Sequence, residues 1–303
     1  MLARLVAGLS VAATPVALRA VEPAPPGDVE RGSAPATSAE PPAGPARGVG
    51  FFFASDFTSA YFFRGILQER DGFIWQPYGG VTLTVATDLA GGIIDEVAVS
   101  LASFNSIQSA DTGAVHSPRS WYESDVIAGV TVGVLDCAST NLSYVAYVFP
   151  NGAYPTGQEL DWTTQLDDSA WLGAFALHPA MLWAFELDNT AFGEQKGVYL
   201  QLETKPGVTL FESADYPLTL ALPLSVGLSV SDYYDVPGGA NDTFGYFDAG
   251  LVASLPLSFV PAAYGAWSVN ASVDVLALSD TLADVNRGDS AFVVGKGGIA
   301  FAY

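Results

Sequence analysis

The chain has 303 residues, and its 32 acidic side chains against 11 Lys and Arg give a net charge of −21. Half of the residues are hydrophobic and only 14% are charged, compared with roughly 25% in ordinary soluble domains. This balance excludes a chain that is disordered throughout, and it excludes a nucleic-acid partner, which would need Lys and Arg for its phosphates. The single cysteine, Cys137, excludes an intramolecular disulfide and a multi-cysteine metal site.

The first 20 residues have the organisation of an export signal. Arg4 supplies a positive start, an apolar stretch covers 5–18, and Ala20 provides a small residue for cleavage. The apolar stretch is shorter than the ~20 residues that a membrane-spanning helix needs, which favours a signal peptide over a transmembrane anchor. We therefore expect residues 1–20 to direct export and then to be removed.

A linker rich in proline and alanine follows at 21–49. It contains no aromatic residue and seven prolines: Pro23, Pro25, Pro26, Pro35, Pro41, Pro42 and Pro45. Such a composition cannot form a packed core, so we expect an extended, solvated segment. A disordered leader is the simpler interpretation, and a tether near the cell wall is the alternative.

Residues 50–303 show the alternation of apolar and polar residues that is typical of β-strands. In 218–230 the even positions are Leu or Val, whereas the odd positions are small or polar. A helix would scatter these leucines around its circumference, but a strand places them on one face. Pro223 cannot donate a hydrogen bond to a neighbouring strand, so it predicts a local bulge.

The same alternation recurs along the chain and predicts an all-β fold. The expected strands are 51–63, 73–86, 95–104, 121–133, 139–149, 158–166, 180–188, 197–204, 217–230, 243–255, 266–278 and 291–303. Most are close to the ~9–11 residues with which a tilted strand crosses a bilayer. We therefore predict a transmembrane, antiparallel, up-and-down β-barrel of about twelve strands. Ten and fourteen strands remain alternatives, because the connections 167–179 and 205–216 are long enough to hide a strand pair or a misplaced strand.

A secreted soluble β-protein is the alternative fold. A barrel is favoured because open sheet edges are not tolerated in hydrocarbon, and because the second face of these strands is small and polar with few lysines. Aromatic residues near the expected strand ends fit interfacial girdles. They are Trp75, Trp121, Tyr122, Trp162, Trp183, Tyr246 and Trp267.

The last strand ends with Ile299, Phe301 and Tyr303 on one face, and the final residue is aromatic. This pattern resembles the C-terminal signature of bacterial outer-membrane barrels. The resemblance implies recognition by the barrel-assembly machinery and a location in the outer membrane.

A more particular resemblance lies in the first expected strand. Residues 55–68 read SDFTSAYFFRGILQ and are followed at 76–80 by QPYGG. This segment resembles the opening of the TorF-type porins, which carry an S-D-Y-x-x-R-G-x-S-Q strand followed by a segment of proline, glutamine and glycine. Leu67 stands where that family has serine, and extra residues separate Asp56 from Arg64. The resemblance implies an outer-membrane channel.

If the leucine and valine faces meet lipid, the opposite face lines the interior, and charged residues belong there. The expected lining acids are Asp56, Glu96, Glu123, Asp125, Glu159, Asp161, Glu186, Asp188, Glu203, Asp248 and Asp274. The expected lining bases are Lys296 and Arg64, the latter near the end of the first strand. An excess of carboxylates attracts cations, so the sequence predicts a passive channel for small cationic or neutral solutes.

Other functions remain as alternatives to this channel. Arg64 and Lys296 could pair with lumen acids and close the barrel, which would leave a structural barrel that anchors the envelope. An outer-membrane hydrolase would have to use His116, beside Ser117, or His178 as its base. We expect no cofactor and no metal ion, and we expect the acid pairs in loops to be solvated. The expected partners are outer-membrane lipid and the assembly machinery, and a homo-oligomer is left open.

Overall fold

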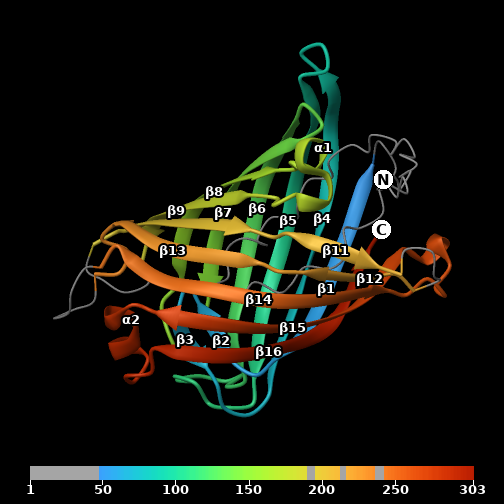
Figure 1. The fold of residues 1–303 in the computed structure, drawn as a ribbon. Coiled ribbons are helices and arrows are strands. Elements are labelled where there is room, and N and C mark those ends of the chain that lie inside the picture. The colour runs from blue at the N-terminus through green and yellow to red at the C-terminus, as the bar shows by residue number, and fades with distance from the viewer. Residues whose placement is uncertain (1–47, 190–194, 212–215, 236–241) are drawn as a thin grey trace, which may run out of the picture.

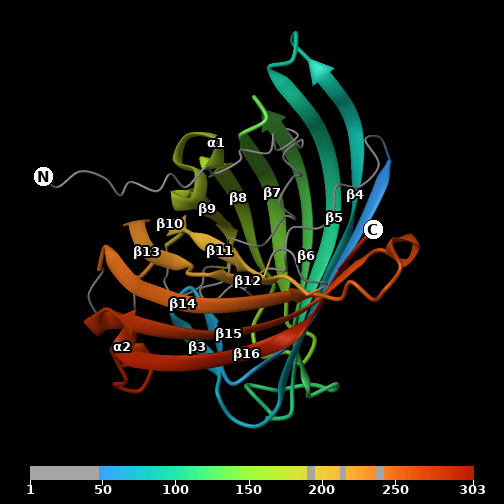
Figure 2. The ribbon, with the colours of Figure 1, turned by 45° about the vertical axis from the view of Figure 1, so that its right-hand side comes forward.

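The computed structural model describes residues 48–189, 195–211, 216–235 and 242–303. The expected signal peptide (1–20) and the expected linker up to residue 47 lie outside these residues. The described chain forms one closed antiparallel β-barrel (Figure 1 and Figure 2). Among the described helices, none has the length and hydrophobicity needed to cross a bilayer.

The barrel wall contains twelve strands, as the alternation predicts. In chain order they are β1 (Val49–Thr58), β4 (Ile74–Leu89), β5 (Ile94–Gln108), β6 (Trp121–Val134), β7 (Ala138–Val148), β8 (Gly157–Leu166), β9 (Ala180–Asp188), β10 (Val198–Thr204), β13 (Leu224–Ser231), β14 (Phe244–Pro256), β15 (Ala266–Leu278) and β16 (Ala291–Ala302). Each strand pairs with its neighbour along this series, and β16 pairs with β1 to close the ring. Closure leaves the wall without an open first or last strand, which is the condition for a sheet in hydrocarbon.

Two prolines explain why the strand boundaries near residue 205 are irregular. β10 continues as β11 (Gly207–Leu210), and the strand expected at 217–230 is divided into β12 (Leu218–Ala221) and β13. Pro206 and Pro223 interrupt the ladder because neither has an N–H group to donate. Leu222 N still donates to Pro206 O over 2.8 Å, and Gly250 N donates to Pro223 O over 2.8 Å. The expected connection at 205–216 was therefore wrong in part, since residues 207–210 within it form a strand.

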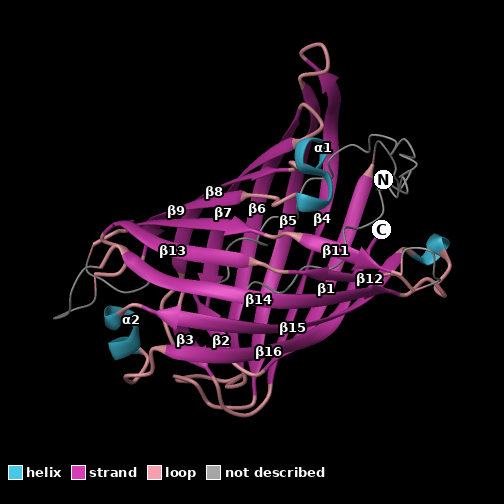
Figure 3. Cartoon of the chain, in the orientation of Figure 1, coloured by secondary structure: helices cyan, strands magenta, loops and turns pink. Residues whose placement is uncertain are grey.

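The other long connection, 167–179, contains no strand pair. It forms α1 (Ser169–Leu172) and η1 (Gly173–Phe175) between β8 and β9 (Figure 3). The alternatives of ten or fourteen wall strands are thus excluded, because each long connection has another explanation.

The two faces of each strand differ as expected. On β15, Ser272 and Asp274 are buried, whereas Val273 and Val275 are about half exposed. The buried face of a closed barrel is its interior, so small and polar residues point inward and aliphatic residues point outward. Ile299 and Phe301 lie on the outward face of β16, and the Phe301 ring packs 4.8 Å from Trp267.

The first expected strand, 51–63, was too long. β1 ends at Thr58, and the chain leaves the wall at Ser59, whose N–H donates to Gly295 O over 2.9 Å. The chain then enters the barrel as β2 (Tyr61–Phe63) and β3 (Ile66–Glu69), which pair only with each other. We call residues 61–69 the plug hairpin.

The two ends of the barrel carry different connections. The loop end contains the plug hairpin and α2 (Asp280–Val285), which lies between β15 and β16. The terminal end contains residues 49 and 302, α1, and η2 (Ala262–Tyr264). At this end Phe51 N donates to Tyr303 O over 2.7 Å, so the last residue is held against the start of β1.

Candidate functional site: the barrel interior

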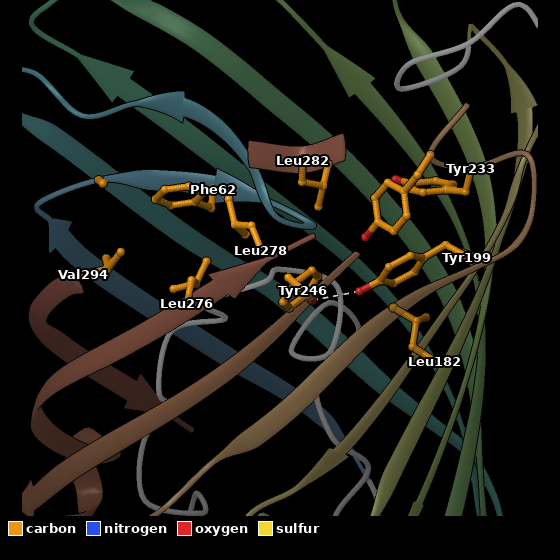
Figure 4. Close-up of a cluster of buried hydrophobic side chains, with 12 residues drawn as sticks. Phe62, Leu182, Tyr199, Tyr233, Tyr246, Leu276, Leu278, Leu282 and Val294 are labelled. Atoms are coloured by element: carbon orange, nitrogen blue, oxygen red, sulfur yellow. Dashed lines mark hydrogen bonds between the residues drawn. The ribbon is translucent and has the colours of Figure 1, made fainter. Parts of the chain in front are cut away.

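The plug hairpin occupies the interior of the loop end and contacts opposite walls. Phe62 belongs to a buried cluster with Leu276, Leu278, Leu282 and Val294 (Figure 4). Its neighbour Tyr61 belongs to a second buried cluster that includes Phe104 and Tyr122, with Phe63 packed against it. Because successive residues of a strand point to opposite sides, the hairpin joins both clusters and fills the space between them.

The tip of the hairpin places an arginine in the middle of this packing. Arg64 was expected near the end of a wall strand, but it lies in the turn between β2 and β3 and is fully buried. One guanidinium nitrogen donates to Glu159 Oε1 over 2.8 Å, and the other lies 2.8 Å from Glu159 Oε2. The second nitrogen is also 3.9 Å from Asp161 Oδ1. One charge-assisted hydrogen bond and a close ion pair therefore join the guanidinium to the Glu159 carboxylate.

Aromatic side chains surround the remaining faces of the guanidinium. Its central carbon lies 4.5 Å from the Tyr199 ring centroid, 4.9 Å from that of Phe63 and 5.2 Å from that of Tyr233. Arg64 also donates to the Tyr233 hydroxyl over 2.8 Å, and Tyr234 donates to the Arg64 carbonyl over 3.0 Å. The loop after β13 therefore closes over the hairpin tip.

A tyrosine network supports this arrangement. The hydroxyls of Tyr199 and Tyr246 are 2.8 Å apart, and both donate to Gln201 Oε1 over 2.8 Å. A Cβ atom at Gly227 would lie 2.2 Å from the Tyr246 ring, so this glycine makes room for it. Tyr246 was wrongly assigned to an outer girdle, and so was Tyr122, which is buried and donates to Gln68. A tyrosine suits both places, because it needs only an apolar surface and one hydrogen-bond partner.

The loop between β15 and β16 packs over the plug hairpin at the loop end of the barrel. Asn286 donates to Gly65 O over 2.7 Å and accepts from Leu67 N over 2.8 Å. Gly65 has a φ of +84°, and a Cβ atom there would lie 2.7 Å from Leu282 of α2. Glycine is therefore required here for both the turn and the close approach of the helix.

The interior towards the terminal end has a different lining. Apart from the Phe52–Tyr78 pair, small polar side chains dominate the inner face. They include Thr131, Ser139, Asn141, Ser143, Ser254, Ser268, Asn270 and Ser272. Asn141 donates to Thr131 Oγ1 over 2.8 Å, which links β7 to β6 across the wall.

The expected lining acids all lie on wall strands, at different depths of burial. Asp56, Glu123, Asp125, Glu159, Asp161, Glu186, Asp248 and Asp274 are buried, Glu96 and Glu203 are half-buried, and Asp188 is exposed at the loop end. Several of these acids accept hydrogen bonds from neighbours. Tyr61 donates to Glu123 over 2.8 Å, Tyr147 donates to Glu159 over 2.9 Å, and Gly197 N donates to Glu186 over 2.6 Å.

Lys296 is the second cation of the expected lining. It pairs in register with Thr58 on one side and Ser272 on the other, and it attracts the carboxylates of Asp56 and Asp274. Two glycines let these acids lie against the wall. A Cβ atom at Gly298 would be 1.9 Å from Asp56 Oδ1, and one at Gly250 would be 2.3 Å from Asp274 Oδ1. The two lining cations thus lie at separate acidic positions.

The contacts described for the two histidines involve residues of the connections, not the interior network. Asp111 pairs with Arg119 over 3.0 Å, while the His116 amide donates to Asn151 O over 2.8 Å. The described loop therefore does not place Asp111 as a partner for the His116 ring. His178 lies at the terminal end, where its Nδ1 is 3.6 Å from Asp167 Oδ1.

The sequence contained a signal for the hairpin that strand alternation alone does not use. Tyr61, Phe62 and Phe63 are three consecutive aromatic residues, whereas the wall strands mostly alternate between an exposed apolar face and a buried, more polar face. A run that is apolar on both faces is compatible with burial on both faces, but residues 51–53 form the same run in wall strand β1, so the signal is weak. Tyr233 and Tyr234 give a similar signal in a loop that is otherwise polar.

Comparisons with known proteins gave matches among solved structures alone. No family model and no curated protein matches the chain. Among solved structures, the NanC porin is similar at 10% identity and a TM-score of 0.40, over 83% of this chain and 98% of that one. An outer membrane channel from Pseudomonas putida F1 is similar at 12% identity and a TM-score of 0.45, over 92% and 100%. The beta domain of the Bordetella autotransporter BrkA is similar at 9% identity and a TM-score of 0.39, over 85% and 99%. At these scores, the fold rests on the strand pairing of the chain itself.

Proposed function

We propose that the chain is a bacterial outer-membrane channel for the passive diffusion of small solutes, and that its plug hairpin restricts the passage. The observation that carries this proposal is the closed ring of twelve antiparallel strands, with an aliphatic outer face and an acidic, polar inner face. Closure satisfies the backbone without water, which is the requirement for a sheet in hydrocarbon.

The outer face supports a lipid environment. Leu101, Leu142, Leu251 and Val273 lie on four different strands, and each is more than half exposed. An aliphatic band around a whole barrel is far larger than the apolar patches of soluble monomers, and lipid covers such a band. Export by a signal peptide leaves both termini in the periplasm. In the proposed orientation, the terminal end therefore faces the periplasm and the loop end faces outward. Ile299, Phe301 and Tyr303 then present the proposed assembly signal at the periplasmic rim.

The inner face supports a preference for cations. The proposed pore-lining set contains eleven carboxylates, while Arg64 and Lys296 are its cations. Arg64 is already paired with Glu159, so the remaining acids set the sign of the potential. A negative lumen with low-dielectric walls concentrates cations and repels anions. Small cationic and neutral solutes are therefore the proposed cargo.

Planar-bilayer recording of the refolded chain tests this proposal. In a KCl gradient we expect small single-channel currents. We also expect a reversal potential shifted from zero towards the equilibrium potential of potassium. Asp274→Asn should move the reversal potential towards zero, whereas Lys296→Met should move it further to the potassium side. A reversal potential on the chloride side would contradict the proposed selectivity.

A closed structural barrel that anchors the envelope is the second candidate function. The observation that favours it is the filling of the loop end by the hairpin, Tyr233 and α2. The absence of current from the native chain and from a variant without the hairpin would select this function over the channel.

The proposal includes a place among the TorF-type porins. It rests on residues 55–68 and 76–80, of which Arg64 and Gly65 form the hairpin tip. The role of these two residues as a fixed tip gives the R-G pair of the resemblance a physical reason.

A further inference from the structure

The connection between β8 and β9 brings three potential metal ligands together at the terminal end. Ligand atoms of Asp167, Asp168 and His178 all lie within 4.8 Å of one another. His178 Nδ1 and Asp167 Oδ1 are 3.6 Å apart. These residues come from the two ends of the connection, so the group forms only when the intervening segment closes on itself.

Backbone contacts hold the two ends together. The Asp168 carboxylate accepts hydrogen bonds from Leu177 N and from His178 N, each over 3.0 Å. The position of the carboxylate beside His178 is therefore fixed before any ligand arrives.

The donor set indicates the class of ion. Calcium and magnesium prefer oxygen ligands alone, whereas an imidazole nitrogen with carboxylate oxygens suits zinc and its neighbours in the first transition row. Ligands around a tetrahedral zinc ion, with bonds of about 2.0–2.1 Å, lie about 3.3–3.5 Å from one another. The observed 3.6 Å between His178 and Asp167 already fits, and the exposed His178 side chain is free to adjust.

We propose that Asp167, Asp168 and His178 form a binding site for a divalent transition-metal ion, with Zn²⁺ as the representative ion. Each residue supplies one ligand, and water completes the coordination. The ion joins the two ends of a connection whose middle exposes Trp171 and Phe175, with 65% and 83% of their surfaces accessible. The site lies outside the lumen and does not depend on conduction.

Calorimetric titration of the full, detergent-refolded chain with Zn²⁺ tests the site. We expect one site in the native chain, with binding at least tenfold weaker in His178→Ala and in Asp167→Asn. His116→Ala is the matched control, because it removes the other histidine and should bind zinc like the native chain. Heat-modifiable migration on gels confirms that each variant has formed a barrel.

A spectroscopic readout separates coordination from nonspecific attraction to an acidic surface. Co²⁺ bound at the site should give visible absorption bands that require His178, and Ca²⁺ should not displace it. The proposal is wrong if the native chain binds no zinc, or if His178→Ala binds zinc as tightly as the native chain. Failure of the channel currents would leave these results unaffected.

Discussion

The loop half and the terminal half of the barrel interior have the same kind of wall but different contents. In the loop half, the plug hairpin and the rings of Tyr199, Tyr233 and Tyr246 pack around a buried arginine. In the terminal half, serine, threonine and asparagine side chains line the wall. Since both halves belong to the same twelve strands, strand number alone does not decide which side chains occupy the interior. The size of the inward side chains and one inserted segment decide it.

The two halves are also stabilised differently. Burying a large apolar side chain such as Phe62 contributes roughly 1.5–3 kcal/mol, and the loop half contains many of these. It also contains a buried ion pair, which holds the hairpin only while both partners are present. The terminal half depends mainly on its strand ladders and on short polar contacts such as Asn141 to Thr131.

Removing the plug hairpin should cause the largest change in the difference between the two halves. If residues 61–69 are replaced by a short Gly-Ser linker, the loop half should resemble the terminal half. We expect single-channel conductance to rise by about tenfold or more, because the passage then follows the width of the wall. Replacement of the exposed turn 90–93 at the terminal end is the control and should leave conductance unchanged. Equal conductance in both variants would show that the hairpin does not restrict the passage.

Arg64→Ala tests whether the ion pair fixes the hairpin. Loss of the guanidinium leaves Glu159 and Asp161 buried without their cation, at a cost of roughly 3–5 kcal/mol in the free energy of unfolding. We expect the urea midpoint to fall and the channel to show longer open times. Arg64→Lys keeps the charge but not the planar guanidinium that reaches both Glu159 and the Tyr233 hydroxyl, so its effect should be intermediate. The additional changes Glu159→Gln and Asp161→Asn should restore part of the lost stability.

The sequence allowed the wall to be predicted well, because alternation directly reflects the two environments of a barrel strand. In β15, and in β14 from Phe247 to Leu255, every second residue is apolar and faces outward. The chemistry of the interior was also visible in part, because the sequence places the charged side chains on the strand face opposite the leucines and valines. Asp56 and Asp274 could therefore be placed on the inner face without coordinates.

The contents of the loop half could not be predicted in the same way. The sequence predicted Arg64 at the end of a wall strand, because residues 51–63 are rich in aromatic residues over their whole length. The inward turn at Ser59 depends on its contacts with Gly295, which is distant in sequence. The partners of Arg64 come from β8 and from the loop after β13, so no local pattern links them. The group formed by Asp167 and His178 was missed for the same reason.

Two neighbouring glycines on β16 allow the inner and outer faces of one strand to be compared. A Cβ atom at Gly298 would lie 1.9 Å from Asp56 Oδ1 and 2.4 Å from Ser55 O, whereas one at Gly297 would meet nothing nearer than 3.8 Å. Gly298→Ala should therefore displace Asp56 and lower the free energy of unfolding by about 1–3 kcal/mol. Gly297→Ala is the matched control and should be nearly neutral. Similar urea midpoints for the two variants would contradict the close contact between Asp56 and the β16 backbone.

The smallest expected effect concerns one hydroxyl in the loop half. Tyr246→Phe removes the contacts of Tyr246 with Tyr199 and Gln201 but keeps the ring that packs beside Gly227. Tyr199 still donates to Gln201 over 2.8 Å, so no acceptor is left without a partner. We expect a loss of about 0.5–1.5 kcal/mol in the free energy of unfolding and no change in conductance.

Tyr144→Phe is the control for this hydroxyl, because Tyr144 lies on the outer face of β7 with 40% of its surface exposed. It should have no measurable effect on the urea midpoint. If Tyr246→Phe raised conductance as much as removal of the hairpin, the polar network rather than ring packing would hold the loop half closed. A small effect, in contrast, would show that aromatic packing and the Arg64 ion pair together keep the hairpin in place.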